Sequence, residues 1–284
     1  MSLKNLYNIF LFYINKARLW KVKESGLINK ASGSSILDSE GNSDYLKSIK
    51  LINQNPSYFS KFRKSKSIYV AIEGLKPNFA QTYENLIETI GWKNGYTNLI
   101  KEFDSVGKPD KYKFRNGKFS TISLRYLKVH LDLISEFGNL DQFKVAEIGA
   151  GYGGQSFFII KQNRIKSYKI FDLPEVNQTI SMFLSQFELP IKCEFGESPS
   201  KTENFDLVIS NYAFSELNRN VQKLYLENVL QKSTRGYMTW NDLSFKKLGG
   251  YSLAELLDLL PGSRYKDEYP LTAIGNVIIT WNNN

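Results

Sequence analysis

The sequence contains a single cysteine, Cys193, and a single histidine, His130. One cysteine cannot form an internal disulfide, and it cannot build a metal site that needs several thiolates. The lack of further histidines excludes most zinc chemistry as well. We therefore predict that Cys193 is a packing residue, and we predict no metal ligands.

Long apolar runs are also missing. The longest one near the start, residues 9–14, is far too short to span a bilayer. No basic start followed by an apolar stretch and a small-residue cleavage site is present, so we expect a cytoplasmic protein. Apolar residues do recur at helical spacing at Leu3, Leu6, Phe10, Tyr13 and Ala17. This amphipathic segment would pack on the body, form a homodimer, or make a peripheral membrane contact.

Acidic residues are outnumbered by basic ones, which gives a formal charge of +9. Nucleic acid, anionic lipid and phosphorylated small molecules are all attracted by such a charge. Lysine and arginine crowd the first 130 residues, whereas the remainder is closer to balanced. A basic region beside a cofactor domain fits a phosphate-bearing substrate, and a merely solvated lysine surface is the alternative. The hydrophobic content of 42% is enough for a sizeable core.

The rhythm of the sequence changes near residue 140 and predicts two domains. Residues 1–139 read as a helical N-terminal or cap region, with a loop or linker at 25–43 and a polar, basic loop at 104–118. A helix is predicted from Ser120 or Ser123 to about Gly138. Residues 140–284 alternate between strands and helices, which indicates an α/β fold with a mostly parallel sheet.

Six strands are expected, at 144–148, 168–172, 191–195, 205–210, 235–240 and 275–281. Four helices are expected between them, at 154–163, 176–187, 219–231 and 252–260. Residues 265–272 and 276–281 could form a hairpin, which would place an antiparallel last strand at the sheet edge.

The segment 145–154, VAEIGAGYGG, predicts a buried strand that turns through glycines into a helix. Gly149, Gly151 and Gly154 satisfy the dinucleotide-binding pattern, and Asp172 ends the next strand, where a carboxylate can bind ribose hydroxyls. Glu147 would repel a pyrophosphate but suits S-adenosylmethionine, whose amino group and sulfonium are cationic. The pattern therefore favours S-adenosylmethionine over NAD.

These motifs resemble a known family. The pattern E-x-G-x-G-x-G is similar to the first motif of the class I (Rossmann-like) methyltransferases, and the match covers the chain from about residue 140. Segments 171–176 (FDLPEV) and 205–211 (FDLVISN) resemble the second motif and the fourth strand of small-molecule O-methyltransferases. Shorter strings at 123–126 (SLRY), 151–155 (GYGGQ) and 212–218 (YAFSELN) resemble proteins assigned as sugar O-methyltransferases of bacterial capsule and O-antigen clusters.

The resemblance implies a set of cofactor-binding residues. Glu147 with Gly149, Gly151 and Gly153 would hold the amino-acid end of S-adenosylmethionine. Asp172 would bind its ribose. Leu173 would pack on the adenine, and Glu197 would accept a hydrogen bond from its amino group, with Glu194 as the competing candidate. Asn211 would lie beside the methionyl moiety, and Arg125 would bind the carboxylate of that moiety.

Methyl transfer to a hydroxyl needs in-line alignment and a base for the alcohol proton. The resembling O-methyltransferases place a His and an Asp after the fourth strand, whereas Ser215 and Glu216 stand here. We therefore take Glu216 as the first candidate base and Asp242, after the fifth strand, as the second or as its partner. His130 is the third candidate, although a structural role is expected to explain it better.

The sequence thus predicts a methyltransferase acting on a sugar hydroxyl of a nucleotide sugar or glycan precursor, for polysaccharide biosynthesis. No specific nucleic-acid partner is predicted, because no Asn-Pro-Pro-Tyr type site or RNA-binding module is visible. An RNA or other small-molecule methyltransferase remains the alternative, and so does a non-catalytic scaffold in glycan assembly. An NAD-dependent sugar enzyme is a further rival, although the expected Tyr-x-x-x-Lys pair is missing.

Overall fold

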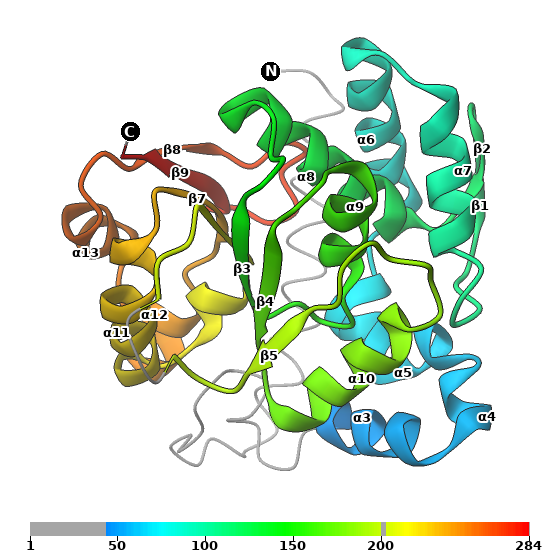
Figure 1. Cartoon of the computed structure of the whole chain (residues 1–284), viewed down its shortest axis with the longest axis horizontal. Helices are drawn as coiled ribbons and strands as arrows, with labels where there is room; N and C mark the ends of the chain where they lie inside the picture. The colour runs from blue at the N-terminus through cyan, green and yellow to red at the C-terminus, as the bar shows by residue number, and fades with distance from the viewer. Residues whose placement is uncertain (1–43, 200–202, 284) are drawn as a thin grey trace.

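A seven-stranded sheet forms the centre of the molecule, with helices on both of its faces (Figure 1). The computed structural model describes residues 44–199 and 203–283. The strands are β3 (Lys144–Ile148), β4 (Ser167–Phe171), β5 (Glu194–Gly196), β6 (Leu207–Asn211), β7 (Arg235–Trp240), β8 (Arg264–Asp267) and β9 (Val277–Asn282). The predicted segments at 3–17 and 25–43 lie outside the described residues.

The strand order is β5-β4-β3-β6-β7-β9-β8. Strands β3 to β7 pair in parallel, whereas β9 is antiparallel to both β7 and β8. The predicted fold class, a mostly parallel Rossmann-like sheet with an antiparallel last strand, is confirmed. The order reverses between β3 and β6, and ligands of open α/β sheets bind beyond the carboxyl ends of strands at such a point.

The predicted hairpin of the last two strands is present, but its position in the sheet differs from the expectation. β9 lies between β7 and β8, and β8 forms the edge. The burial of the two strands explains this arrangement. Five of the six residues of β9 are buried, whereas all four residues of β8 are exposed. The apolar strand therefore takes the interior position and the polar strand takes the edge.

Side chains alternate between the two faces of each strand, so that each face has its own hydrophobic core. Val145 belongs to one cluster, and its neighbour Ala146 belongs to the other. The helices over the first face are α3 (Asp44–Gln54), α6 (Pro77–Ile90), α7 (Asn94–Phe103), α8 (Thr121–Phe137), α9 (Gly154–Gln162) and α10 (Pro174–Leu184). Those over the second face are α11 (Arg219–Asn228) and α13 (Leu253–Leu259), while α12 (Leu243–Leu248) follows β7. The first core is continuous from the N-terminal helices to the sheet.

Short elements complete the N-terminal region: α4 (Pro56–Phe59), η1 (Phe62–Lys64), α5 (Lys66–Ile68) and η2 (Tyr69–Glu73). The predicted helix after Ser120 is confirmed as α8, which Ser120 caps at its start and Gly138, with a φ of +76°, ends. Within the described residues, every helix is too short or too polar to cross a bilayer.

The predicted loop at 104–118 instead contains a hairpin of β1 (Tyr112–Phe114) and β2 (Gly117–Phe119). Two features of the hairpin explain the difference. Phe114 and Phe119 are buried. In addition, the buried carboxylate of Glu84 accepts hydrogen bonds from the turn's backbone N–H groups, at 3.1 Å from Arg115 and 2.8 Å from Asn116. This clamp comes from α6, more than thirty residues away, so no local pattern announces it.

Candidate functional site

The glycine turn connects β3 to α9 at the carboxyl edge of the sheet. Gly149, Gly151 and Gly153 have φ values of +72°, +62° and +91°. Glycine adopts this left-handed region without the steric cost that a Cβ atom imposes. The predicted strand–turn–helix geometry is therefore present, and each of the three predicted glycines occupies a position that requires glycine.

Two segments cover this turn. A Cβ atom built on Gly149 would overlap the Cβ of Ala213, in the segment after β6. One built on Gly151 would lie 2.9 Å from the Cδ1 atom of Ile72, in η2 of the N-terminal region. The turn is thus enclosed by side chains from both halves of the sequence.

Asp172, directly after β4, holds the glycine turn in place. Its carboxylate accepts hydrogen bonds from the backbone N–H of Ala150 at 3.0 Å and of Leu173 at 2.8 Å. Burial raises its pKa to about 7, although these backbone donors oppose the increase. A carboxylate offers about four lone-pair sites, so these two bonds leave acceptor capacity for ligand hydroxyls.

Glu147 lies within β3 and is almost fully buried. Its carboxylate accepts a hydrogen bond of 2.8 Å from the hydroxyl of Tyr168 in β4. Burial raises the pKa of Glu147 to about 8, because the charged form loses its hydration. The same carboxylate, together with burial as the larger cause, raises the pKa of the partly buried Cys193 to about 12. Cys193 therefore behaves as a packing residue.

An open depression of about 560 Å³ lies beyond β4 and β5. Glu197 and Gly196 line it, together with Asn177 of α10. The Asn177 amide donates hydrogen bonds to the carbonyl oxygens of Asp172 at 2.9 Å and Gly196 at 3.1 Å. Its own Oδ1 atom is buried and has no partner among the described residues. Asn177 thus joins the backbone after β4 and β5 to a wall of the depression, which the predicted adenine-binding residue Glu197 also lines.

The two candidate acids lie after neighbouring strands. Glu216 follows β6, and its Oε1 atom accepts a hydrogen bond of 3.0 Å from the side chain of Asn241. Asp242 follows β7, and its carboxylate accepts a hydrogen bond of 3.0 Å from the indole N–H of Trp240. Burial raises the pKa of Glu216 above its ordinary value. Glu216 is therefore hydrogen-bonded to Asn241, the residue before Asp242, at the carboxyl edge of the sheet.

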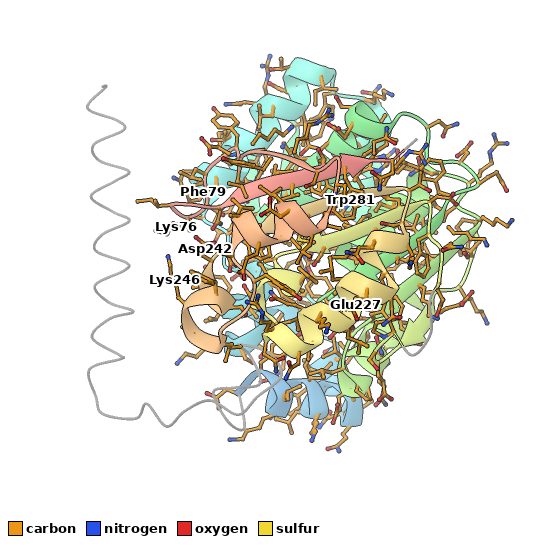
Figure 2. The ribbon with its side chains drawn as sticks, turned by 90° about the vertical axis from the view of Figure 1, so that its left-hand side faces the viewer. Lys76, Phe79, Glu227, Asp242, Lys246 and Trp281 are labelled. Carbon is orange, nitrogen blue, oxygen red and sulfur yellow. The ribbon has the colours of Figure 1, made fainter. Side chains whose placement is uncertain are left out.

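Figure 2 shows which side of the molecule this edge occupies. Asp242 and Lys246 lie on the same side as Lys76, the N-cap residue of α6, and Phe79, which lies in its first turn. Basic side chains of the N-terminal region and of the sheet domain therefore share the side on which β7 ends.

His130 lies elsewhere. It is buried in the middle of α8, nine residues past the start of a helix that leads toward the beginning of β3, or roughly 13 Å along its axis. Burial and the charge of Lys93 lower its pKa to about 4, so the imidazole is neutral at pH 7. Its Nδ1 atom has no hydrogen-bond partner in the described part of the chain. This environment supports a structural role.

Asn211 and Arg125 both lie near the end of β6. Asn211 ends β6 and accepts a 3.4 Å hydrogen bond from Thr239. The next residue, Tyr212, has a φ of +70°, and the guanidinium of Arg125 lies 4.7 Å from its ring centroid. The hydroxyl of Tyr212 donates to Glu268, in the loop after β8. The structure thus places Arg125 beside Tyr212.

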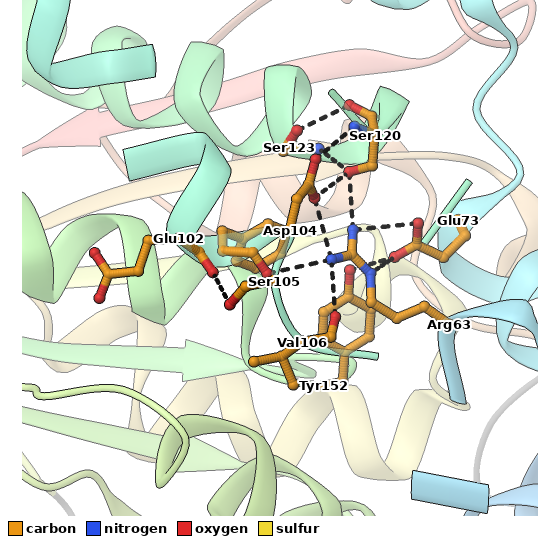
Figure 3. Close-up of polar contacts among 10 residues, drawn as sticks. Arg63, Glu73, Glu102, Asp104, Ser105, Val106, Ser120, Ser123 and Tyr152 are labelled. Carbon is orange, nitrogen blue, oxygen red and sulfur yellow. Dashed lines mark hydrogen bonds and ion pairs between the residues drawn. The ribbon is translucent and has the colours of Figure 1, made fainter. Parts of the chain in front are cut away.

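A buried ion network ties the N-terminal region to the glycine turn (Figure 3). Arg63 is 1% exposed and pairs with Glu73 at 2.7 Å and with Asp104 at 3.2 Å. Glu73 also accepts a hydrogen bond from the hydroxyl of Tyr152, which stands inside the turn. Ser120 joins the network by accepting from Arg63 at 2.8 Å.

Sequence reasoning missed Asn177, Glu268 and the Arg63 network. Asn177 directly follows the segment 171–176 (FDLPEV), and a polar residue one turn into an apolar helix is a signal that could have predicted its role. Glu268 and Arg63 carry no local signal, because their partners are distant in sequence. Among the residues described, no three His, Cys, Asp or Glu side chains converge to hold a metal ion.

The sequence matches no family model, and no curated protein matches it. Solved structures of methyltransferases are similar at low identity. A candidate RNA methyltransferase from Pyrococcus horikoshii has 17% identity and a TM-score of 0.42, covering 56% of this chain and 83% of that one. Mitomycin 7-O-methyltransferase has 15% identity and a TM-score of 0.43, with 57% and 55% covered. A TehB-like S-adenosylmethionine-dependent methyltransferase from Corynebacterium glutamicum has 14% identity and a TM-score of 0.38. The match covers 57% of this chain and 98% of that one. Similarity of this extent identifies neither a substrate nor a reaction.

Proposed function

We propose that this chain is an S-adenosylmethionine-dependent O-methyltransferase that acts on a sugar hydroxyl of a nucleotide sugar or glycan precursor. The observation that carries the proposal is the turn of three positive-φ glycines, with Glu147 before it and Asp172 bonded to it. A buried carboxylate beneath the turn suits a cationic ligand and disfavours a pyrophosphate. The sugar acceptor rests on the resemblance of the strings at 123–126, 151–155 and 212–218, and RNA or another small molecule is the alternative.

The residues present fit the cofactor. Adenine carries an amino group, and the carboxylate of Glu197, which lines the depression beyond β4 and β5, offers an acceptor for it. Asp172 retains capacity for the ribose hydroxyls, while Glu147 supplies negative charge near the amino-acid end. Asn211, the last residue of β6, would lie beside the amino-acid end of the cofactor. In this proposal residues 140–284 form the catalytic domain, and the N-terminal helices form a cap that reaches the turn through Ile72.

When bound, S-adenosylmethionine supplies a methyl group on a sulfonium leaving group. The protein must then align an acceptor hydroxyl with that methyl carbon and remove the hydroxyl proton. Glu216 is the base that the geometry supports best. It lies at the carboxyl edge, Asn241 orients it, and its raised pKa makes it a stronger base than an exposed glutamate. Asp242 is the second candidate.

The first test is calorimetric binding of S-adenosylhomocysteine and of NAD⁺ to the purified protein. We expect micromolar binding of the former and none of the latter. Glu197→Ala should weaken binding about tenfold, because it removes an acceptor from the adenine. Asn177→Leu should also weaken binding, because it removes the amide that donates to the carbonyl oxygens of Asp172 and Gly196. Glu188→Ala, which removes an exposed acid that does not line the depression, is the matched control. Binding of NAD⁺ alone would refute the reaction class, and binding of neither ligand would favour a scaffold.

The raised pKa of Glu147 predicts a pH dependence of cofactor binding. Below pH 8 the carboxyl is largely protonated and neutral in the free protein, and it ionises as the pH rises. Affinity for the cationic cofactor should therefore increase by up to about fiftyfold from pH 6 to pH 8, in proportion to the ionised fraction of a group with this pKa. Glu147→Gln should reduce this increase, and Tyr168→Phe should move it to higher pH, because the Tyr168 hydrogen bond lowers the pKa. An unchanged pH profile in Glu147→Gln would contradict the prediction.

A further inference from the structure

Arg125 carries a positive charge that no acidic side chain of the described residues neutralises by direct contact. It belongs to the second turn of α8 and is partly buried. Its guanidinium stacks on the ring of Tyr212 at 4.7 Å, but it makes no hydrogen bond or ion pair with any described residue. Arginine stays protonated in proteins and offers five donors. Because burial of an unpaired charge costs free energy, an anion that paired with these free donors would be bound favourably.

The nearest acid is already engaged. Glu268 is 5% exposed, and its carboxylate accepts hydrogen bonds from the Tyr212 hydroxyl and from the backbone N–H of Thr272 at 3.2 Å. The side chains of Thr272 and Asn276 donate to it as well. These donors satisfy Glu268 without Arg125. The cluster instead fixes Tyr212, whose positive φ costs energy for a residue with a side chain and marks the position as strained.

The neighbours of Arg125 define the half of the site to which it belongs. Tyr212 follows β6 and Glu268 follows β8. The glycine turn and Asp172 follow β3 and β4, on the other side of the point where the strand order reverses. The proposed bases, Glu216 and Asp242, follow β6 and β7. Arg125 therefore lies on the side of the bases, where an acceptor must bring its hydroxyl.

We infer that Arg125 binds an anionic group of the methyl acceptor, either the carboxylate of an acidic sugar or a phosphate of a sugar phosphate or nucleotide sugar. The inference rests on the proposed function and narrows its substrate class. A guanidinium matches both groups by two parallel hydrogen bonds. The family resemblance instead implies that Arg125 binds the cofactor's carboxylate, and the position beside β6 and β8 favours the acceptor.

The test uses the full chain, S-adenosylmethionine and pairs of acceptors that differ in an anionic group: glucuronate against glucose, and glucose 1-phosphate against glucose, with UDP-glucose as the nucleotide-linked form. Variants are Arg125→Met and Arg125→Lys. Arg235→Met is the matched control, because Arg235 also stacks on an aromatic ring, 4.9 Å from Phe143, but at the opposite edge of the sheet. We measure binding to the S-adenosylhomocysteine complex, and methyl transfer as kcat/KM.

We expect the kcat/KM of at least one charged acceptor to exceed that of its neutral partner tenfold or more in the wild type. In Arg125→Met this ratio should fall to about one, with Arg125→Lys intermediate, while the affinity for S-adenosylhomocysteine changes less than twofold. The inference is overturned if that affinity falls tenfold while the ratio persists, if the wild type uses both partners equally, or if no charged acceptor binds. Failure of the wild type to bind S-adenosylhomocysteine would instead refute the proposed function itself.

Discussion

Replacing Gly149 with alanine should destabilise the protein by about 2–4 kcal/mol and abolish cofactor binding. Two effects add. The φ of +72° is unfavourable for any residue with a Cβ atom, which costs about 1 kcal/mol. The new methyl group would also overlap the Cβ of Ala213, and a packed site of this kind loses about 1–3 kcal/mol more. Urea unfolding and calorimetry with S-adenosylhomocysteine measure the two outcomes.

Two further variants separate strain from overlap. Gly138 has a φ of +76°, but a Cβ atom there would meet nothing within 4 Å. Gly138→Ala should therefore lose only about 1 kcal/mol and keep cofactor binding. The pair Gly149→Ala with Ala213→Gly removes the overlap and should recover part of the lost stability. If Gly149→Ala is no less stable than Gly138→Ala, the enclosure of the turn by Ala213 is not a close contact in solution.

The glycine turn could be predicted from the sequence because its causes are local. A buried strand, glycines at fixed spacing and an acid after the next strand all lie within thirty residues. The same holds for α8, where Ser120 and Gly138 mark both ends. The hairpin at Tyr112 to Phe119 was missed, because its stability depends on Glu84 from another helix.

The candidate site divides in the same way. Glu216 and Asp242 could be placed at the carboxyl edge because each lies within a few residues of the end of a predicted strand. His130 is the single histidine of the sequence, but this says nothing of how deeply the side chain is buried in α8. Glu268 joins the site only because β8 is the edge strand and β9 lies inside, an order that no spacing in the sequence encodes. Ile72 covers Gly151 through a contact across seventy-nine residues of chain, which periodicity cannot detect.

Arg63→Met should lower the free energy of unfolding by about 3–5 kcal/mol at pH 8. The substitution keeps most of the apolar volume but removes the cation from a buried cluster, which leaves Glu73 and Asp104 without their counter-charge (Figure 3). The control is Arg164→Met, whose pair with Asp141 involves an arginine side chain that is 86% exposed. That exposed pair should contribute no more than about 1 kcal/mol. Urea unfolding of both variants measures the difference.

The loss in Arg63→Met should shrink as the pH falls. Burial already raises the pKa of Glu73, and Arg63 opposes that increase. Without Arg63 the folded-state pKa rises further above the unfolded value, so protonation stabilises the folded variant, and this contribution disappears as the pH rises. We expect a smaller loss at pH 5 than at pH 8, and equal losses would show that the charge of Glu73 is not the cause.

Because Glu73 also holds Tyr152 inside the glycine turn, the same variant should bind S-adenosylhomocysteine more weakly while still folded. The N-terminal helices would then act on the glycine turn through this hydrogen bond as well as through Ile72, and Tyr152→Phe, which removes only the hydroxyl, should reproduce the weaker binding without the full loss of stability.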